Sequence, residues 1–382
     1  MSTHYDWLIV GAGFTGAVVA ERLAKELDQR VLVVDRRSHI AGNAYDFRDG
    51  ADNLTHLYGP HIFHTNSRKI FDHLSQFTEW RPYFHRVLAH IDGIYAPIPF
   101  NLNTIAALFP STMADRLGDK LIQSFGYGAR APIMKLKGEG LDGELAFLAD
   151  YIYDKVFLNY TTKQWGRSPE QLDPSVTARV PVVISRDDRY FNDVYQCMPQ
   201  DGYTVMFDRM LDHKNITVEL NTDFLDVPSS AYDRAVYCGA VDEYFGGEHG
   251  PLPYRSLRFK FDTVKSNAGL PTGTVNYPNE FAFTRMTDFS YLTGDDLPTR
   301  SLVTEYPQEY VPGENDPYYP IPSPETKELI KPYQAMVSEL RGKVWFAGRL
   351  ADYTYYNMDQ ACGRGLSLFE KELVPAVTGN AE

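Results

Sequence analysis

The 382-residue chain has little cysteine and no long hydrophobic run, and these two shortages exclude several classes of protein. Its three cysteines, Cys197, Cys238 and Cys362, are widely spaced and form no C-x-x-C pair, so we expect reduced thiols rather than a disulfide framework or a zinc knuckle. No stretch approaches the roughly 18 consecutive apolar residues of a membrane span. Asp6 precedes the first apolar run, where a secretory signal would carry basic residues. The sequence therefore predicts a cytoplasmic protein without a membrane span.

Positive charge is scarce as well. The chain carries 37 lysine and arginine residues against 50 aspartate and glutamate residues, which gives a net charge of -13. This balance argues against a nucleic-acid partner or an anionic membrane surface, because both carry negative charge themselves. If the protein binds a phosphorylated small molecule, a few arginines at specific positions would therefore have to contact the phosphate. The remaining composition, with 43% hydrophobic residues, is that of a globular protein of two or three subdomains.

The segment GAGFTG predicts a dinucleotide site. It holds Gly11, Gly13 and Gly16 in the spacing G-x-G-x-x-G, between an apolar strand at residues 6–10 and the helix-spaced run AVVAERLAKEL. A second apolar run, RVLVVD, ends at Asp35. In such a unit the glycines admit a pyrophosphate to the helix N-terminus, and the acidic residue binds ribose hydroxyls. The alternative is a glycine turn that only packs the helix on the strand, and the two flanking strands favour the nucleotide site.

The chain then leaves this pattern and returns to it near the C-terminus. RVLAHIDGIYAPIPF predicts a strand pair turning at Asp92-Gly93, and GELAFLADYIYDKVFLNY has helical periodicity. KVWFAGRL predicts a strand ending at Gly348, and NMDQACGRGLSLFEKEL predicts a helix that begins near Asn357. A second strand–helix element of this kind closes flavin folds and is rare at the end of NAD folds. The residues therefore favour a flavin nucleotide.

We expect an α/β fold in which a Rossmann-like FAD-binding domain carries an inserted small helical subdomain and an antiparallel β-sheet subdomain. The expected boundaries are 1–80, 200–245 and 335–382 for the discontinuous FAD-binding domain, 103–160 for the helical subdomain, and 81–102, 161–199 and 246–334 for the sheet subdomain. Pro169, Pro174 and Pro181 disfavour regular structure, so a mobile loop is expected at about 165–180.

Nine segments across most of the chain carry a further signal. They are RRSHIAGNAYD (36–46), YGPHIFHT (58–65), NYTTKQWG (159–166), RVPV (179–182), DDRYFND (187–193), MPQDGYT (198–204), EYPQEY (305–310), PYYPI (317–321) and FAGRLADYTYYNMDQ (346–360). In this order they resemble the bacterial type of UDP-galactopyranose mutase. Two positions depart from the pattern common in that family. Ala41 replaces a glycine beside the cofactor, and Asn357 replaces an aspartate that many relatives carry.

The resemblance implies an isomerase that interconverts UDP-galactopyranose and UDP-galactofuranose, and thereby supplies galactofuranose for cell-surface glycans. In that family FAD acts in its reduced form: N5 attacks the anomeric carbon as UDP leaves, and a flavin–sugar iminium then opens the ring. The resemblance also implies a homodimer. No metal is expected, because His61 and His64 stand at i and i+3 without a nearby cysteine or acidic cluster.

The resemblance assigns candidate residues to both ligands. The cofactor-binding candidates are Gly11, Gly13, Phe14, Thr15, Gly16, Asp35, Arg36, Gly42, Asn43, His61, Phe224, Gly348, Arg349, Tyr355, Asn357 and Met358. The substrate-binding candidates are His85, Phe157, Tyr160, Thr161, Trp165, Arg179, Tyr190, Asn276, Arg285, Tyr319 and Tyr355. A tyrosine offers a flat apolar face to a base and a hydroxyl to a phosphate, so Tyr160 is expected to stack on uracil, and Tyr190, Tyr319 and Tyr355 to contact the diphosphate.

Arg179 and Arg285 are the candidate catalytic residues. A diphosphate gains charge as its glycosidic bond breaks, and a guanidinium group neutralises that charge with planar, bidentate hydrogen bonds. Arg179 ends the proline-rich loop, from which it could close over a bound substrate.

Two other functions stay open from the residues alone. A flavin-dependent oxidoreductase resembling the amine oxidases would share the glycine motif and the closing strand–helix element, but it would not need the arginine and tyrosine set. A flavin-binding protein without catalysis, acting as a structural or regulatory partner, would not need Arg179 and Arg285.

Overall fold

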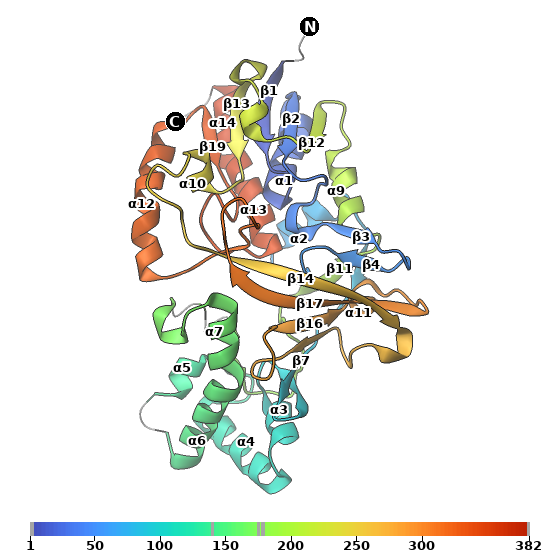
Figure 1. Cartoon of the computed structure of the whole chain (residues 1–382), viewed down its shortest axis with the longest axis vertical. Helices are drawn as coiled ribbons and strands as arrows, with labels where there is room; N and C mark the ends of the chain where they lie inside the picture. Colours follow the sequence, from blue (N-terminus) through green and yellow to red (C-terminus); the bar gives the residue numbers. More distant parts are fainter. Residues whose placement is uncertain (1–3, 139–140, 174–175, 177–179, 380–382) are drawn as a thin grey trace.

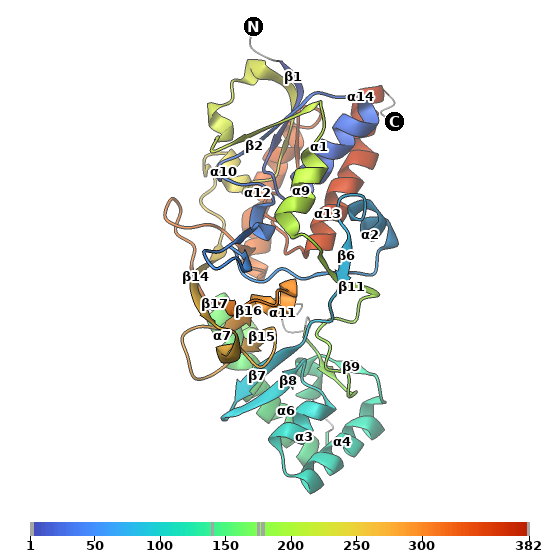
Figure 2. The ribbon, with the colours of Figure 1, turned by 90° about the vertical axis from the view of Figure 1, so that its right-hand side faces the viewer.

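The computed structural model describes residues 4–138, 141–173, 176 and 180–379. Figure 1 shows an elongated molecule with three parts along its long axis: a sheet with helices beside both chain ends, long strands across the middle, and a group of helices at the far end. The view in Figure 2, turned by 90°, separates the same three parts. This is the α/β architecture with several sheets that the sequence predicts.

The first part is a parallel sheet of Rossmann type. Its strands in spatial order are β12 (Ile216–Leu220), β2 (Val31–Asp35), β1 (Tyr5–Val10), β13 (Tyr232–Tyr237) and β19 (Val344–Phe346). The uninterrupted apolar runs of β1 and β2 are buried, as expected for a parallel sheet covered on both faces. The last strand ends at Phe346, so Gly348 lies in the turn that follows it.

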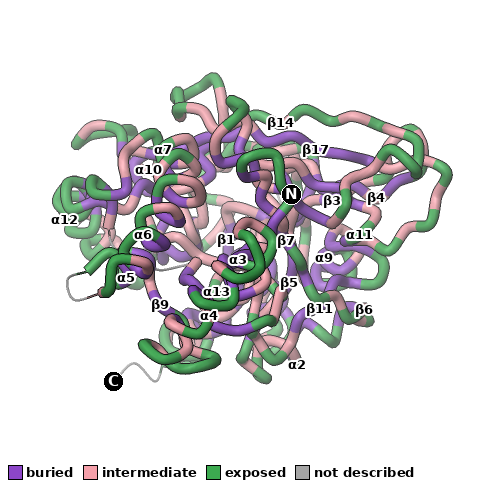
Figure 3. Tube along the Cα trace, turned by 90° about the horizontal axis from the view of Figure 1, so that it is seen from below, coloured by how far each residue is buried: buried purple, intermediate pink, exposed green. Residues whose placement is uncertain are grey.

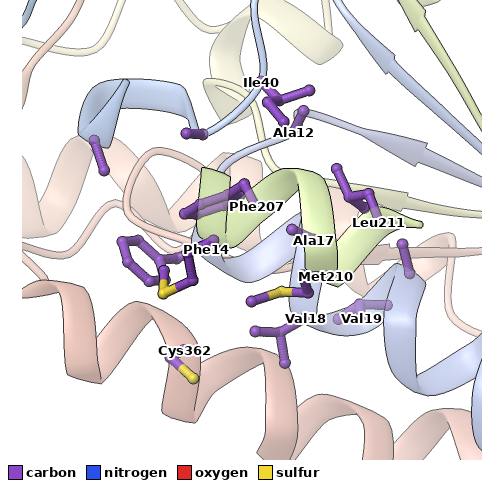
Figure 4. Close-up of a cluster of buried hydrophobic side chains, with 14 of the residues drawn as sticks. Ala12, Phe14, Ala17, Val18, Val19, Ile40, Phe207, Met210, Leu211 and Cys362 are labelled. Atoms are coloured by element: carbon purple, nitrogen blue, oxygen red, sulfur yellow. The ribbon is translucent and has the colours of Figure 1, made fainter. Parts of the chain in front are cut away.

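Helices cover both faces of this sheet. The helices α1 (Phe14–Leu27), α9 (Tyr203–Leu211) and α13 (Met358–Leu368) lie on one face, and α10 (Val241–Tyr244) and α12 (Pro324–Glu339) lie on the other. Figure 4 shows Phe14 and Val18 of α1 packed against Phe207 and Met210 of α9, with Cys362 of α13 below them. This buried cluster fixes the start of α1, which carries the glycine motif, against the sheet.

The middle part is a seven-stranded sheet. Its strands in spatial order are β18 (Tyr319–Pro320), β14 (Tyr254–Lys265), β17 (Thr299–Glu309), β16 (Arg285–Asp288), β15 (Thr274–Asn276), β7 (Val87–Ile91) and β8 (Ile94–Ile98). The sheet is antiparallel, as expected, except at one pair, where β15 runs parallel to β7. These two strands come from distant segments, so no hairpin dictates their direction. The hairpin of β7 and β8 turns at Asp92 and Gly93, as predicted, with φ angles of 50° and 83°.

The far part is helical. It contains α3 (Leu102–Leu108), α4 (Ser111–Phe125), α5 (Ile133–Leu136), α6 (Gly143–Ile152), the π-helical segment η2 (Tyr153–Leu158) and α7 (Asn159–Trp165). The last three elements follow one another without a break and point their C-terminal end at the middle sheet (Figure 1). Leu117, Leu148 and Ile152 belong to the separate apolar core of this part.

Smaller elements connect the three parts. The short strands are β5 (Phe63–Thr65), β11 (Tyr195–Pro199) and β6 (Trp80–Pro82), which form one sheet, and the pairs β3 (Asp46–Arg48) with β4 (Leu54–His56) and β9 (Arg130–Ala131) with β10 (Val182–Val183). The remaining helical elements are η1 (Gly42–Ala44), α2 (Arg68–Leu74), η3 (Pro169–Gln171), η4 (Phe224–Asp226), η5 (Ser229–Ala231), η6 (Ser266–Ala268), α11 (Phe289–Thr293), η7 (Phe369–Leu373) and α14 (Val374–Thr378).

The buried residues are distributed according to these three parts. Figure 3 shows buried residues concentrated along the strands, whereas a peripheral helix such as α12 exposes most of its length. Among the helices of the described residues, none combines the length and the apolar character needed to cross a membrane.

Candidate active site

Three glycines shape the turn between β1 and α1. Gly11 has a φ of 106°, which favours glycine. A Cβ on Gly16 would lie 1.9 Å from the carbonyl oxygen of Gly11, so no larger residue fits there. A Cβ on Gly13 would instead come no closer than 3.7 Å, to Cα of Gly42. Gly13 therefore keeps space open at the N-terminus of α1, where helical N–H groups attract an anion.

Asp35 lies at the end of β2, beside this turn. One of its carboxylate oxygens accepts a hydrogen bond from the N–H of Ala12 and the other accepts one from the N–H of Arg37, each at 2.9 Å. Each oxygen keeps a further lone pair, so the oriented carboxylate can also accept ribose hydroxyls. Arg36, the next residue, forms an ion pair with Glu243 at 3.3 Å.

An elongated cavity of about 460 Å³, here called the dinucleotide cavity, connects these features. It begins at Asp35, passes the glycine turn and ends at His61 and Met358. Fourteen of the cofactor-binding candidates line it: Gly11, Gly13, Phe14, Thr15, Gly16, Asp35, Arg36, Gly42, Asn43, His61, Phe224, Gly348, Arg349 and Met358. The other two, Tyr355 and Asn357, lie in the adjoining cavity. The residues present fit a dinucleotide whose second ring reaches His61.

The two departures from the family pattern lie beside this cavity. Ala41 has a φ of 69°, a left-handed conformation that glycine adopts without strain, and its N–H donates to the carbonyl of Ala12 at 2.9 Å. Asn357 caps α13, and its N–H donates to the side-chain oxygen of Gln360 at 2.9 Å. An amide at this cap serves the helix as a carboxylate would, without adding negative charge to the site.

His61 stands where the dinucleotide cavity meets the next one. Because a carbonyl only accepts, Nδ1 of His61 donates to the carbonyl of Gly59, at 2.9 Å. Its backbone N–H donates to Nδ1 of His56 at 3.1 Å. Burial, with a smaller contribution from the neighbouring His56, lowers the pKa of His61 to about 3. The ring is therefore neutral, with Nε2 as an acceptor.

A second cavity of about 190 Å³, here called the reaction chamber, adjoins His61. It shares His61, Arg349 and Met358 with the dinucleotide cavity. Six of the residues on its wall also line a third cavity of about 200 Å³, the substrate cavity, and these are Tyr160, Tyr190, Asn276, Arg285, Tyr319 and Tyr355. The chamber is thus the place where ligands entering from the two sides would meet.

The predicted substrate residues gather around these two cavities. Phe157, Thr161 and Trp165 line the substrate cavity together with apolar side chains such as Ile98, and His85 lines only the chamber. Arg179 lies outside the described residues. Of the loop expected at 165–180, the buried residues Trp165 and Leu172 pack together in one apolar cluster.

Arg285 and its neighbours form a row across the middle sheet. Asn276 of β15 stands opposite Arg285 of β16, which stands opposite Glu305 of β17. Nε and Nη2, which lie on one edge of the guanidinium group, donate to the two oxygens of Glu305, with 3.0 Å for the Nη2 contact. The Glu305 side chain is 2% exposed and that of Arg285 is 30% exposed, so the arginine faces the cavities while its partner is enclosed.

Electrostatics keep Arg285 charged. Burial alone would lower its pKa, but the charge of Glu305, with contributions from Tyr160 and Tyr319, raises it well above the usual value. Glu305 is the residue that motif reasoning missed, although it opens the EYPQEY segment. The available signal was a charged residue within the strand-like run SLVTEY, but the arginine that faces it depends on strand register.

Stacked aromatic rings form part of the wall that the chamber shares with the substrate cavity. Tyr319 and Tyr355 stack with 5.2 Å between ring centroids and an angle of 17°. The guanidinium carbon of Arg349 lies 5.6 Å and 5.4 Å from these two rings, within the range of a cation–π contact. Trp165 packs on the other side, with its ring centroid 6.2 Å from that of Tyr319. Across the described residues, no three His, Cys, Asp or Glu side chains are grouped to hold a metal.

The fold and the dinucleotide cavity define a protein of the Rossmann-like, dinucleotide-binding class, and residues 9–77 match the NAD(P)-binding Rossmann-like domain family. Residues 155–355, which include the row with Arg285, match the family described as GLF, UDP-galactopyranose mutase. The chain belongs to the UDP-galactopyranose mutase family and is an isomerase.

Individual relatives cover nearly the whole chain. A protein named probable UDP-galactopyranose mutase, from Klebsiella pneumoniae, is 35% identical over 370 residues, covering 96% of this chain and 94% of the relative. A dTDP-fucopyranose mutase from Escherichia coli is 32% identical over 360 residues, covering 92% of this chain and 94% of the relative. A crystal structure of reduced UDP-galactopyranose mutase has the same fold, with a TM-score of 0.74 at 17% identity, over 99% of this chain and 94% of the other.

Proposed function

We propose that the protein is an FAD-dependent UDP-galactopyranose mutase that interconverts UDP-galactopyranose and UDP-galactofuranose. The observation that carries this proposal is the joining of three cavities through shared lining residues, with Arg285 on the wall shared by the last two. A dinucleotide that reaches His61 would place its second ring at the chamber. A nucleotide sugar entering from the substrate cavity would place its diphosphate at Arg285 and its sugar in the chamber.

The reduced flavin supplies the nucleophile for the anomeric carbon when it is bound. The residues of this chain bind and orient the reactants. Arg285, held by Glu305, and Tyr190, Tyr319 and Tyr355 would surround the diphosphate, where they would stabilise the charge of the departing UDP. A substrate bound between these aromatic side chains would displace water from them, which would strengthen these interactions and protect the activated sugar from hydrolysis.

The sugar and the base of the substrate need a separate test. The two relatives above have similar identities to this chain, and one is named for a dTDP-fucose substrate. Family membership therefore supports the pyranose–furanose reaction more strongly than it supports the identity of the nucleotide. We place UDP-galactose first because the matched family carries that description.

We further propose a cytoplasmic homodimer whose product is used for cell-surface glycans. These parts of the proposal rest on the resemblance of the sequence motifs to bacterial mutases, and light scattering of the purified protein tests the dimer directly.

The decisive experiment incubates FAD-loaded protein with UDP-galactofuranose, with and without dithionite, and separates the products by chromatography. Conversion to the pyranose only under reducing conditions is expected. A parallel incubation with dTDP-fucofuranose tests the nucleotide: conversion of this sugar alone would keep the reaction class but overturn the substrate. Failure of the reduced enzyme to convert either sugar would contradict the mutase assignment.

Two further measurements separate the alternatives. Oxygen-dependent formation of hydrogen peroxide from a primary amine would favour the amine-oxidase-like oxidoreductase, and we expect none. The variants Arg179→Ala and Arg285→Ala should each lower turnover by orders of magnitude and leave the flavin absorbance intact, because their expected role is at the diphosphate. Full turnover in either variant would refute the role assigned to that arginine.

A further inference from the structure

The reaction chamber holds a histidine–carboxylate pair that the proposed chemistry has not used. Nδ1 of His64 and Oδ2 of Asp193 are 2.8 Å apart. Asn66 donates from its side-chain amide to the other oxygen of Asp193, also at 2.8 Å. His64 stacks on Phe191 with 3.7 Å between the ring centroids and an angle of 14°. The imidazole is therefore fixed in both position and plane.

The strand pairing explains why His64 reaches the chamber. His64 is the middle residue of β5 and stands opposite Gln196 of β11. Its neighbours Phe63 and Thr65 are buried on the other side of the strand, so that His64 points away from the core and lines the chamber with Arg285. With Nδ1 engaged by Asp193, the ring presents Nε2 as its remaining polar atom, and among the described residues no hydrogen-bond partner occupies it.

The three histidines of the chamber differ in their partners. Nδ1 of His61 is engaged by a carbonyl, and Nδ1 of His85 lies 3.0 Å from the hydroxyl of Tyr83. Burial lowers the pKa of His85 to about 3, with Arg285 and His64 adding to the effect. His61 and His85 are therefore neutral. Among the described chamber histidines, His64 alone has a carboxylate partner, and such a partner stabilises an imidazolium.

The pyranose–furanose exchange requires a group that both gives and takes a proton. When the pyranose opens, the bond between C1 and the ring oxygen breaks, its electron pair stays on the oxygen, and this oxygen takes up a proton. When the furanose closes, the hydroxyl oxygen on C4 forms a bond to C1 and releases a proton. The two transfers balance, so that no external acid, oxidant or reductant is consumed.

We propose that His64, oriented by Asp193, contacts the sugar in the chamber and carries this proton between its two oxygens. The inference rests on the proposed function. Nε2 of His64 donates the proton to the ring oxygen during opening and takes a proton from the C4 hydroxyl during closure. Asp193 is a positioning residue: it fixes the tautomer and balances the charge of the imidazolium.

The principal variant is His64→Asn. The asparagine amide can still donate to Asp193 from the position of Nδ1, but it has no atom at the position of Nε2. If His64 only holds β5 to Asp193 through this hydrogen bond, the variant should therefore keep its activity. If His64 carries the proton, kcat should fall by roughly 10²–10⁴-fold, whereas KM should change less than threefold. His4→Asn is the control, because His4 also pairs with an aspartate, with 2.9 Å between its Nε2 and Oδ1 of Asp233, at an exposed site.

A second measurement does not depend on turnover. Oxidised, FAD-loaded protein with ¹⁵N-labelled histidine is titrated with UDP and, separately, with UDP-galactopyranose. The sugar nucleotide should shift the ring resonances of His64, and UDP should leave them in place, because only the sugar would reach the chamber. The resonances of His4 should stay unchanged in both titrations.

The outcomes separate this inference from the proposed function. If reduced wild-type protein converts no sugar, the proposed function fails, whatever the histidine resonances show. If the wild type is active and His64→Asn keeps kcat within threefold, or if the sugar leaves the His64 resonances unmoved, the proton-carrying role is overturned. Should His64→Asn fail to load flavin, Asp193→Asn decides: a kcat at least tenfold below wild type supports the proposal, and an unchanged kcat overturns it.

Discussion

Arg285 and Glu305 stand directly opposite each other on β16 and β17, and the carboxylate holds the guanidinium group at two points. The pair is asymmetric, since the Glu305 side chain is 2% exposed and that of Arg285 is 30% exposed. The arginine therefore presents its open side to the cavities in a fixed orientation. Such preorganisation is how an enzyme stabilises developing charge without reorganising at the moment of reaction.

The variant Glu305→Gln tests whether orientation or charge matters more at this site. The substitution would remove the negative charge that opposes a diphosphate, so UDP should bind at least as tightly as it does to the wild type. The guanidinium group would lose its two-point support, however, and kcat should fall roughly 10–100-fold. Calorimetry with UDP and steady-state kinetics measure the two effects. A kcat within threefold of wild type would show that Glu305 does not position Arg285.

Two glycines of one motif should behave differently when changed to alanine. In Gly16→Ala the new Cβ would lie 1.9 Å from the carbonyl oxygen of Gly11, a clash inside the protein. The cost should be a few kcal/mol, and the folded protein should be destabilised even without flavin. In Gly13→Ala the nearest atom would be 3.7 Å away, so the flavin-free protein should keep its thermal midpoint.

Flavin binding completes this comparison. The methyl group of Gly13→Ala would occupy space at the N-terminus of α1, where the pyrophosphate is expected, and flavin affinity should fall at least about tenfold. Thermal melting of both flavin-free variants, together with the flavin content of the purified proteins, gives the test. A Gly13→Ala protein with normal flavin content would place the pyrophosphate elsewhere.

The sequence alone predicts the Rossmann part of this fold well, because its signals are local. Apolar runs in β1 and β2, a glycine turn between them and an acidic residue at position 35 lie within 31 residues, from Tyr5 to Asp35. The middle sheet is harder to predict. Its parallel pair joins β7 to β15, and nothing near either strand specifies that partner or its direction.

The same limit applies to the site. The family resemblance selects Arg285 and Asn276 as candidates, yet their alignment with Glu305 depends on the register of three strands. Likewise, nothing in the sequence near His64 indicates its partner. Only the pairing of β5 with β11 brings it close to Asp193. The contacts that matter for function join segments that are distant in the sequence, and local sequence patterns do not predict them.

Buried neutral histidines predict a loss of stability in acid. Burial lowers the pKa of His56 to about 3, whereas in the unfolded chain a histidine takes up its proton near pH 6.5. Between these values the unfolded state binds more protons, so the free energy of unfolding should fall as the pH falls from 6.5 towards 3. Each such histidine contributes up to about 1.4 kcal/mol per pH unit.

His56→Asn isolates one of these contributions. The asparagine oxygen can replace Nδ1 of His56 as the acceptor for the N–H of His61, which lies 3.1 Å away in the wild type. Denaturant titrations at several pH values should give a slope shallower by about 1 kcal/mol per pH unit than in the wild type. The exposed His4 provides the control variant, His4→Asn. Equal slopes for wild type and His56→Asn would mean that His56 takes up its proton in the folded state.

Arg255 should govern substrate affinity without touching the substrate. It lies on β14, and its guanidinium group donates to the carbonyl of Gln164 at 3.1 Å and to that of Lys163 at 3.3 Å. These carbonyls belong to the last turn of α7, where a cation is favourable. The same helix carries Tyr160 and Trp165 on the wall of the substrate cavity.

Arg255→Ala would leave the end of α7 without this support. We expect KM for the nucleotide sugar to rise about tenfold and stability to fall by about 1–3 kcal/mol, with the flavin spectrum unchanged because the dinucleotide cavity is elsewhere. Arg258→Ala is the matched control. Its guanidinium group lies 4.1 Å from the ring centroid of Tyr306 on the same strand pair, away from α7. If both variants raise KM equally, the effect belongs to the sheet as a whole, and the hydrogen bonds to α7 do not set the substrate affinity.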